Sequence, residues 1–106
     1  MSFPTKPNRW LLLEAETPTG PVYKVFATWA GGYLDGDNWR LNSGVEKTLD
    51  HEDHYEFQGY SGSVYLCNKD SYGIAGGYNH GVLAQFIQKG FTLVHESELQ
   101  EKLNVS

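Results

Sequence analysis

Turn-forming residues divide this chain into short segments, and that pattern limits what it can fold into. Its twelve glycines and four prolines recur among Asn, Asp and Ser residues, and the apolar runs between them are rich in aromatic side chains. Short aromatic runs bounded by such turn residues are typical of β-strands, whereas a helical bundle needs longer periodic segments. The sequence therefore predicts a fold rich in sheet and turns.

About six short strands follow from this pattern. The first two, residues 10–16 and 22–29, flank a turn that contains Pro and Gly, so they predict an antiparallel hairpin. Shorter strands are expected further along the chain, at 39–41, 55–57, 64–67 and 91–94, and residues 45–49 are a further candidate. The apolar run Trp10–Leu13 indicates a well-buried strand, and Phe26 and Phe57 in mid-strand positions are expected in the core.

One helix is expected at about residues 81–89. Val82, Leu83, Phe86 and Ile87 recur at helical spacing, and Gly90 stands where a helix commonly stops. Ser97 could cap a short C-terminal helix over 98–103. The predicted class is α+β: a single domain over 1–106 with a twisted, mainly antiparallel sheet, a helix packed on it, and an extended segment at 1–8.

The net charge is concentrated in residues 35–56. That stretch has a net charge of −5, as does the whole 106-residue chain. Only Arg40 and Lys47 oppose its seven carboxylates, which are Asp35, Asp37, Glu46, Asp50, Glu52, Asp53 and Glu56. Such a field attracts basic surfaces and repels the nucleic-acid backbone, so direct nucleic-acid binding is not expected.

Aromatic residues lie among these carboxylates or beside glycines in expected loops. Aromatic anchors next to acidic groups suit contact with a basic protein surface. The residues expected to bind a partner are Tyr33, Asp35, Asp37, Trp39, Asp50, Glu52, Asp53, Tyr55, Glu56 and Tyr60. The alternative is that the carboxylates only keep the protein in solution.

Two motifs contain residue types that bind metal ions. His51-Glu52-Asp53-His54 offers suitable ligands, but no third strong ligand is identifiable. Asp35-Gly36-Asp37-Asn38 lacks the remaining positions of a calcium-binding loop. We therefore expect no metal ion and no cofactor.

Cys67 is the single cysteine, which excludes an internal disulfide and indicates a reducing, cytoplasmic compartment. As a nucleophile it would need His80 or His95 as a base, with the glycine-rich stretch 73–81 as a ligand-binding loop. Its place inside an expected strand favours a core role instead.

These observations favour a small, acidic, non-enzymatic protein that binds a partner. In its sharpest form the hypothesis is an inhibitor or modulator that masks a basic surface of the kind that binds nucleic acid. In size and charge the chain is similar to small phage and mobile-element proteins, including anti-CRISPR and other anti-defence proteins. A small enzyme or ligand-binding domain using Cys67 and His80, and a homo-oligomer built through strand edges, remain alternatives. No apolar run is long enough for a membrane span.

Overall fold

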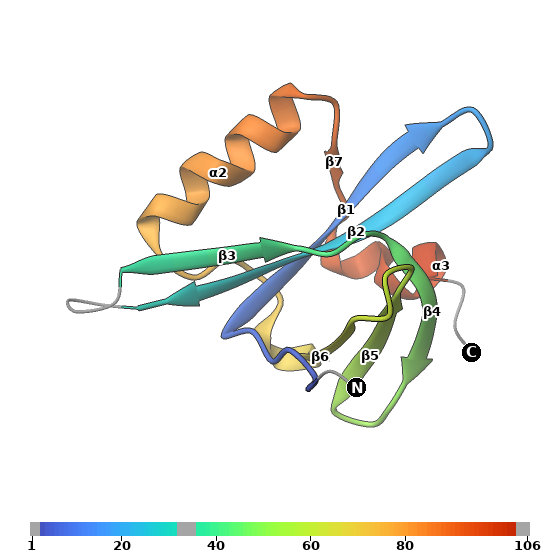
Figure 1. The fold of residues 1–106 in the computed structure, drawn as a ribbon, viewed down its shortest axis with the longest axis horizontal. Helices are drawn as coiled ribbons and strands as arrows, with labels where there is room; N and C mark the ends of the chain where they lie inside the picture. Colours follow the sequence, from blue (N-terminus) through green and yellow to red (C-terminus); the bar gives the residue numbers. More distant parts are fainter. Residues whose placement is uncertain (1–2, 32–35, 104–106) are drawn as a thin grey trace.

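The computed structural model describes residues 3–31 and 36–103. Its helices and strands alternate with short turns along the chain (Figure 1). In order they are β1 (Arg9–Thr17), β2 (Gly20–Ala30), β3 (Asp37–Leu41), β4 (Val45–Asp50), β5 (His54–Gly59), β6 (Val64–Asn68), the 3-10 turn η1 (Lys69–Ser71), α2 (Gly77–Gln88), β7 (Thr92–Leu93), the 3-10 turn η2 (Glu96–Glu98) and α3 (Leu99–Leu103). None of these helices is long and apolar enough to cross a bilayer.

The strands form two antiparallel sheets, one with the order β3-β2-β1-β7 and the other with the order β4-β5-β6. Helix α2 covers one face of the four-stranded sheet, and the three-stranded sheet lies across its other face (Figure 1). The predicted α+β class, the β1–β2 hairpin, the packed helix and the short C-terminal helix are confirmed.

The chain leaves the first sheet at a bend between β3 and β4. Asn42 is buried there, donating its backbone N–H to the carbonyl of Val25 and accepting the N–H of Val25 with its side-chain oxygen. Gly44 then has φ +133°, which favours glycine, and the ring of Tyr60 lies against it. The next strand therefore starts a new sheet instead of continuing β3.

Strand β1 is buried on both faces, as its apolar run predicted. Trp10 and Leu12 pack between the two sheets, while Leu11 and Leu13 pack beneath α2. Side chains alternate between the faces of a strand, so a strand between two packed layers needs apolar residues at consecutive positions. Phe26 and Phe57 are fully buried, as expected.

Helix α2 begins at Gly77, several residues earlier than its apolar periodicity indicated. The carboxylate of Asp37 on β3 accepts the backbone N–H of Tyr78 at 3.1 Å and so satisfies a donor of the first turn. Gly76 has φ +87°, and a Cβ there would collide with the same carboxylate. Gly77 and Gly81 lower the helix propensity of this segment, and the hydrogen bond to Asp37 on β3 offsets that loss.

The two ends of the described chain pack onto the sheets. Thr5 bonds with Val64 and Leu66, so the extended N-terminal segment lies along the edge of β6. At the other end, His95 precedes η2 and Ser97 lies inside it, so the expected Ser97 cap was wrong. Gly90, with φ +111°, follows the end of α2 as expected.

Candidate functional site

The acidic stretch that is continuous in the sequence divides between two places in the fold. Asp37 lies at the start of β3 in the four-stranded sheet, whereas the acidic residues from Asp50 onward surround the β4–β5 turn of the other sheet (Figure 1). Asp35 and Tyr33 lie outside the described residues. The structure therefore does not bring the described acids into one patch.

Asp37 has an internal role. It is half-buried, and its carboxylate lies at the first turn of α2, where backbone N–H groups and the helix dipole favour negative charge. The sequence predicts Asp37 on a partner-binding surface, and that stays a prediction; within the chain its carboxylate already accepts the N–H of Tyr78. A carboxylate in this position also occupies the helix end where the glycine-rich stretch could otherwise have received an anion.

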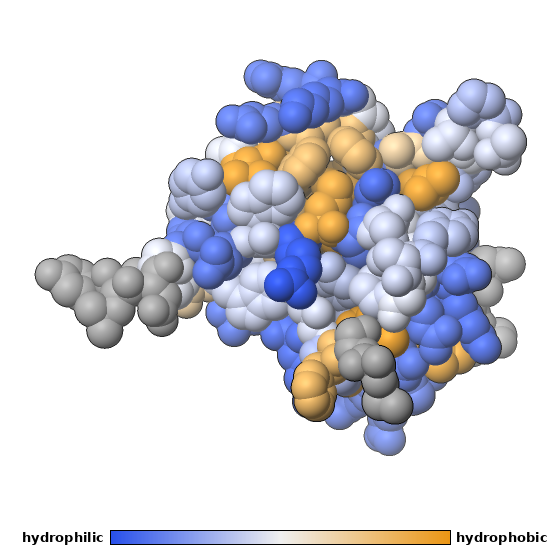
Figure 2. All heavy atoms as spheres, in the orientation of Figure 1, coloured by the Kyte–Doolittle hydropathy of each residue, from blue (hydrophilic) through white to orange (hydrophobic). Residues whose placement is uncertain are grey.

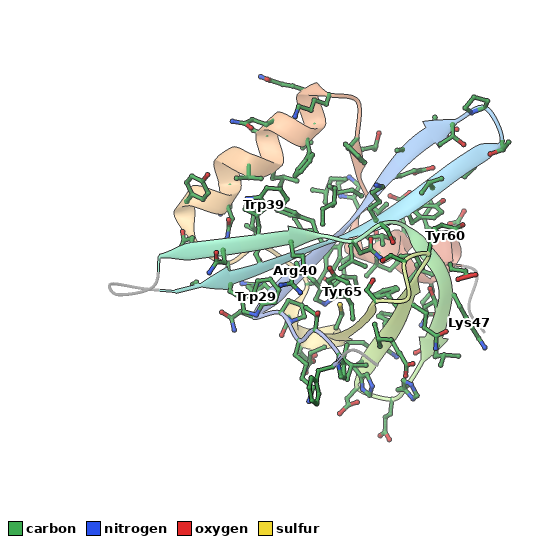
Figure 3. All side chains as sticks on the ribbon, viewed as in Figure 1. Trp29, Trp39, Arg40, Lys47, Tyr60 and Tyr65 are labelled. Atoms are coloured by element: carbon green, nitrogen blue, oxygen red, sulfur yellow. The ribbon has the colours of Figure 1, made fainter. Side chains whose placement is uncertain are left out.

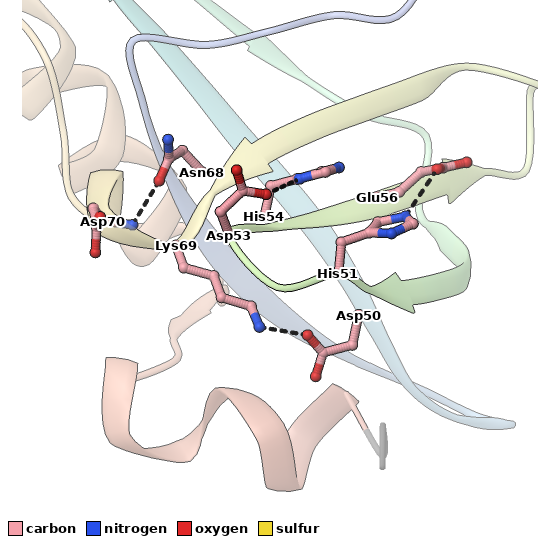
Figure 4. A network of polar contacts seen from close by, with 8 residues as sticks. All are labelled: Asp50, His51, Asp53, His54, Glu56, Asn68, Lys69 and Asp70. Atoms are coloured by element: carbon pink, nitrogen blue, oxygen red, sulfur yellow. Dashed lines mark hydrogen bonds and ion pairs between the residues drawn. The ribbon is translucent and has the colours of Figure 1, made fainter.

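The β4–β5 turn, here called the acidic turn (residues 50–56), contains a set of internal ion pairs (Figure 4). Asp50 pairs with Lys69 at 2.5 Å, and the hydrogen bond raises the pKa of the lysine. Asp53 accepts from His54 at 2.6 Å, a hydrogen bond that lowers the carboxyl pKa. Both contacts lie within the chain, so they hold the turn without needing a partner.

Glu56 and the two histidines complete this network. The side-chain amide of Gln58 is the main cause that lowers the pKa of Glu56, and His51 at 3.4 Å adds to it. The rings of His51 and His54 stack with centroids 4.5 Å apart. Within residues 3–31 and 36–103, no three His, Cys, Asp or Glu side chains are grouped so as to hold a metal ion.

Tyr55 was wrongly placed on the partner-binding surface. It is 4% exposed and packs against Trp10 and Phe57 between the sheets. Buried and half-buried residues alternate along β5, so Tyr55 points inward with Phe57. The apolar residue two positions further on was the sequence signal that could have shown this.

What the acidic turn offers to solvent is therefore narrower than the sequence indicated. Glu52 and Asp53 form its tip, and the Asp53 side chain is 81% exposed. Asp50 and Glu56 are largely covered, with side-chain exposures of 16% and 24%. Of the acids predicted here, Glu52 and Asp53 are the pair most accessible to a partner.

Two exposed aromatic side chains lie elsewhere, beside β3 and α2. Trp39 is 40% and Tyr78 67% exposed, and both line an open hollow of about 330 Å³. The other lining residues are Gly81, Val82, Gln85, Phe86 and Lys89; the whole set is called the aromatic groove. Figure 2 shows hydrophobic atoms between α2 and the edge of β3 on this face. Sequence reasoning found Trp39 but not the groove.

The remaining predicted tyrosine lies apart from both surfaces. Tyr60 is 63% exposed and follows the end of β5, whereas the acidic turn lies at the start of that strand (Figure 3). Tyr72, another tyrosine beside a glycine, is partly buried and packs against the core instead. Its hydroxyl donates to the carbonyl of Val94 and accepts the N–H of Leu12, and burial raises its pKa to about 12.

Cys67 belongs to the core between the sheets. It is fully buried on β6, and burial raises the pKa of its thiol far above the ordinary value. His80 is exposed on α2, across the four-stranded sheet, and no hydrogen bond among the described residues joins Cys67 to a histidine. A thiol that remains protonated is a poor nucleophile, so the geometry gives no support to Cys67 as the nucleophile of an enzyme.

This burial makes a direct prediction. Ellman's reagent should react with Cys67 in the native protein only as fast as the protein unfolds, and rapidly in denaturant, because the thiol has no solvent contact. Absorbance of the released thiolate measures both rates. Labelling of the native protein at the rate of the unfolded chain would contradict the placement.

No family model, curated protein or solved structure matches this chain.

Proposed function

We propose that this chain is a non-enzymatic protein-binding protein that inhibits or modulates its partner by masking a basic surface. The observation that carries the proposal is the acidic turn, where Glu52 and Asp53 are presented to solvent at the tip of the β4–β5 hairpin. Exposed carboxylates on a chain with a net charge of −5 favour encounter with basic surfaces and disfavour nucleic acid.

The internal pairs of the turn support this role. The contacts of Asp50 with Lys69 and of Glu56 with Gln58 and His51 hold the hairpin, and the backbone N–H of Lys69 also donates to Asp53 O at 2.9 Å. A turn ordered before binding loses less conformational entropy on association, so its charges contribute more to affinity. Two exposed carboxylates on a fixed hairpin therefore suit neighbouring lysines or arginines of a partner.

The test is a charge reversal at the tip. Affinity capture from the source cells with the unchanged protein identifies the bound protein, which is then purified with its nucleic-acid ligand. The protein should compete with that ligand, and Glu52→Lys with Asp53→Lys should weaken competition about tenfold or more, equivalent to about 1.4 kcal/mol. Glu16→Lys with Glu101→Lys is the matched control, with the same change in net charge at exposed positions away from the turn.

Salt provides a second arm of the same test. Raising the salt from 0.1 to 1 M shortens the screening length from about 10 Å to about 3 Å, so competition should weaken in high salt. Equal competition by the charge-reversed and unchanged proteins would overturn the proposal, as would a captured protein that lacks a basic surface.

A further inference from the structure

The outer edge of β3 is open. β3 is the terminal strand of its sheet, and no strand among the described residues pairs with its other side. Val25 directs both backbone groups toward Asn42 on the β3 side, so Ala27 and Trp29 do the same by the alternation of an antiparallel ladder. Ala27 pairs with Arg40 and Trp29 pairs with Asn38, so Arg40 and Asn38 direct their backbone groups toward β2. Trp39 lies between them, and its N–H and C=O are therefore directed outward.

This edge is complementary to itself. Trp39 is the middle residue of β3, flanked by Asn38 and Arg40 and ending at Asp37 and Leu41. We propose that two copies of this chain associate through antiparallel pairing of β3 with β3, centred on Trp39. Trp39 of one copy then faces Trp39 of the other, and the two residues exchange both backbone hydrogen bonds. In the same way, Asp37 of each copy exchanges two backbone hydrogen bonds with Leu41 of the other.

The charges on the α2 side fit this arrangement. Helix α2 begins beside Asp37 at the start of β3, and Lys89, which follows the last residue of the helix, also lines the aromatic groove. A two-fold axis at Trp39 runs the two helices antiparallel, so Lys89 of each copy is directed toward the Asp37 end of the other. The exposed faces of Trp39 and Tyr78 are covered in the same step.

The other face of β3 also has a hollow that can receive side chains of the second copy. Trp29, Asn38, Trp39 and Arg40 line a second hollow of about 320 Å³. In the paired strands Asn38 faces Arg40 of the second copy, whose guanidinium can donate to the amide oxygen and stack on Trp29. Among residues 3–31 and 36–103, the Arg40 side chain has a single hydrogen bond, a long contact of 3.4 Å to Thr5, so little is lost when it turns outward.

Pairing of this kind stops at two copies. The interface uses the same edge of both chains, so its two-fold symmetry is closed and neither β3 edge remains for a third copy. An exposed strand edge is otherwise an aggregation hazard, and self-pairing removes it. A second copy is therefore a better match to this edge than a strand without these complementary groups.

Cysteine cross-linking tests the register directly. The facing positions 38 and 40 form a pair without ladder hydrogen bonds, with Cα atoms about 4.5 Å apart, within the disulfide range of about 4.4–6.8 Å. The double variant Asn38→Cys with Arg40→Cys should form a covalent dimer on mild oxidation, seen on a non-reducing gel. Cys67 is buried and does not contribute.

The two single variants are the controls, because each introduced thiol faces the other position in the second copy. They should remain monomeric on the gel under the same oxidation. Equal cross-linking of the single and double variants would overturn the proposed register, as would absence of cross-linking in the double variant.

Sedimentation provides the independent measurement. The unchanged protein should shift from monomer to dimer as its concentration rises, and Trp39→Lys should raise the dimer dissociation constant about tenfold or more by placing like charges face to face. Thermal unfolding checks that this variant folds, and Arg40→Glu, at an exposed position, serves if it does not. A monomer at the highest soluble concentration would overturn the proposal without touching the proposed role of the acidic turn.

Discussion

Replacing Trp10 by alanine is expected to lower the free energy of unfolding by about 3–5 kcal/mol. The indole is fully buried, with ring centroids 5.9, 5.4 and 4.7 Å from those of Tyr55, Phe57 and Tyr72. Its removal leaves a cavity where the layers meet, and packing cannot close it without moving both sheets. Such a loss is a large part of the about 5–15 kcal/mol typical of a whole domain.

The same ring connects the core to the acidic turn. Its Nε1–H donates to Asn68 O at 2.8 Å, and the next residue, Lys69, pairs with Asp50 and donates its backbone N–H to Asp53. Trp10→Ala should therefore also loosen the turn. Urea unfolding followed by circular dichroism measures the stability, and amide hydrogen exchange measures the turn.

Trp10→Phe is the matched control. It retains an aromatic ring in the same place but leaves Asn68 O without its donor, so a smaller loss of about 1–3 kcal/mol is expected. If the free energy of unfolding of Trp10→Ala lay within about 1 kcal/mol of that of the unchanged protein, the expected contribution of the indole to the core would be contradicted.

Replacing Asn79 by aspartate is expected to cost about 3–5 kcal/mol at neutral pH, the range for an unpaired buried charge. Asn79 is fully buried, and its amide NH₂ donates to three carbonyls, those of Ala75 at 2.8 Å, Asn38 at 2.9 Å and Trp29 at 3.4 Å. A carboxylate has no hydrogen to donate and would face these oxygens with a negative charge.

The penalty should depend on pH in a definite direction. Burial beside carbonyls raises the pKa of the introduced carboxyl in the folded state above its value of about 3.9 in the unfolded chain. The variant therefore binds the proton more tightly when folded. Its stability relative to the unchanged protein recovers below the unfolded pKa and is lost as the pH rises through the folded value.

Asn79→Leu separates the charge from the lost hydrogen bonds. It removes the amide donor from the same three carbonyls without adding a charge, and a loss of about 2–3 kcal/mol without the added pH dependence is expected. Urea unfolding from pH 3 to pH 8 measures both variants against the unchanged protein. Equal pH profiles for the two variants would contradict the buried position of the amide.

Residues whose roles depend on near neighbours were predictable. The turn at residues 17–21, the buried run Trp10–Leu13 and the glycine that follows α2 were each found because their signals are local. Tyr55 could also have been assigned to the core, since Phe57 two positions away shows the same period. The prediction that Tyr55 is a surface anchor relied on the neighbouring acids and not on the alternation of side chains along the strand.

The start of α2 could not have been found in the same way. Its first turn is rich in glycine, and what holds it there is a carboxylate from β3, about 40 residues away in the sequence. The aromatic groove has a similar origin, since Trp39 meets the helical residues Tyr78 and Phe86 only after the sheet has formed.

The sequence by itself determined the α+β class, most strand positions and the concentration of charge, because turn residues, side-chain periods and charge are properties of short segments. Only the tertiary structure decided how the charge is distributed. The bend at Asn42 and Gly44 sends β3 and β4 into different sheets, so Asp37 is used at the start of α2 while Glu52 and Asp53 are presented at the acidic turn. Contacts between distant segments made that division, and no short stretch of sequence contains them.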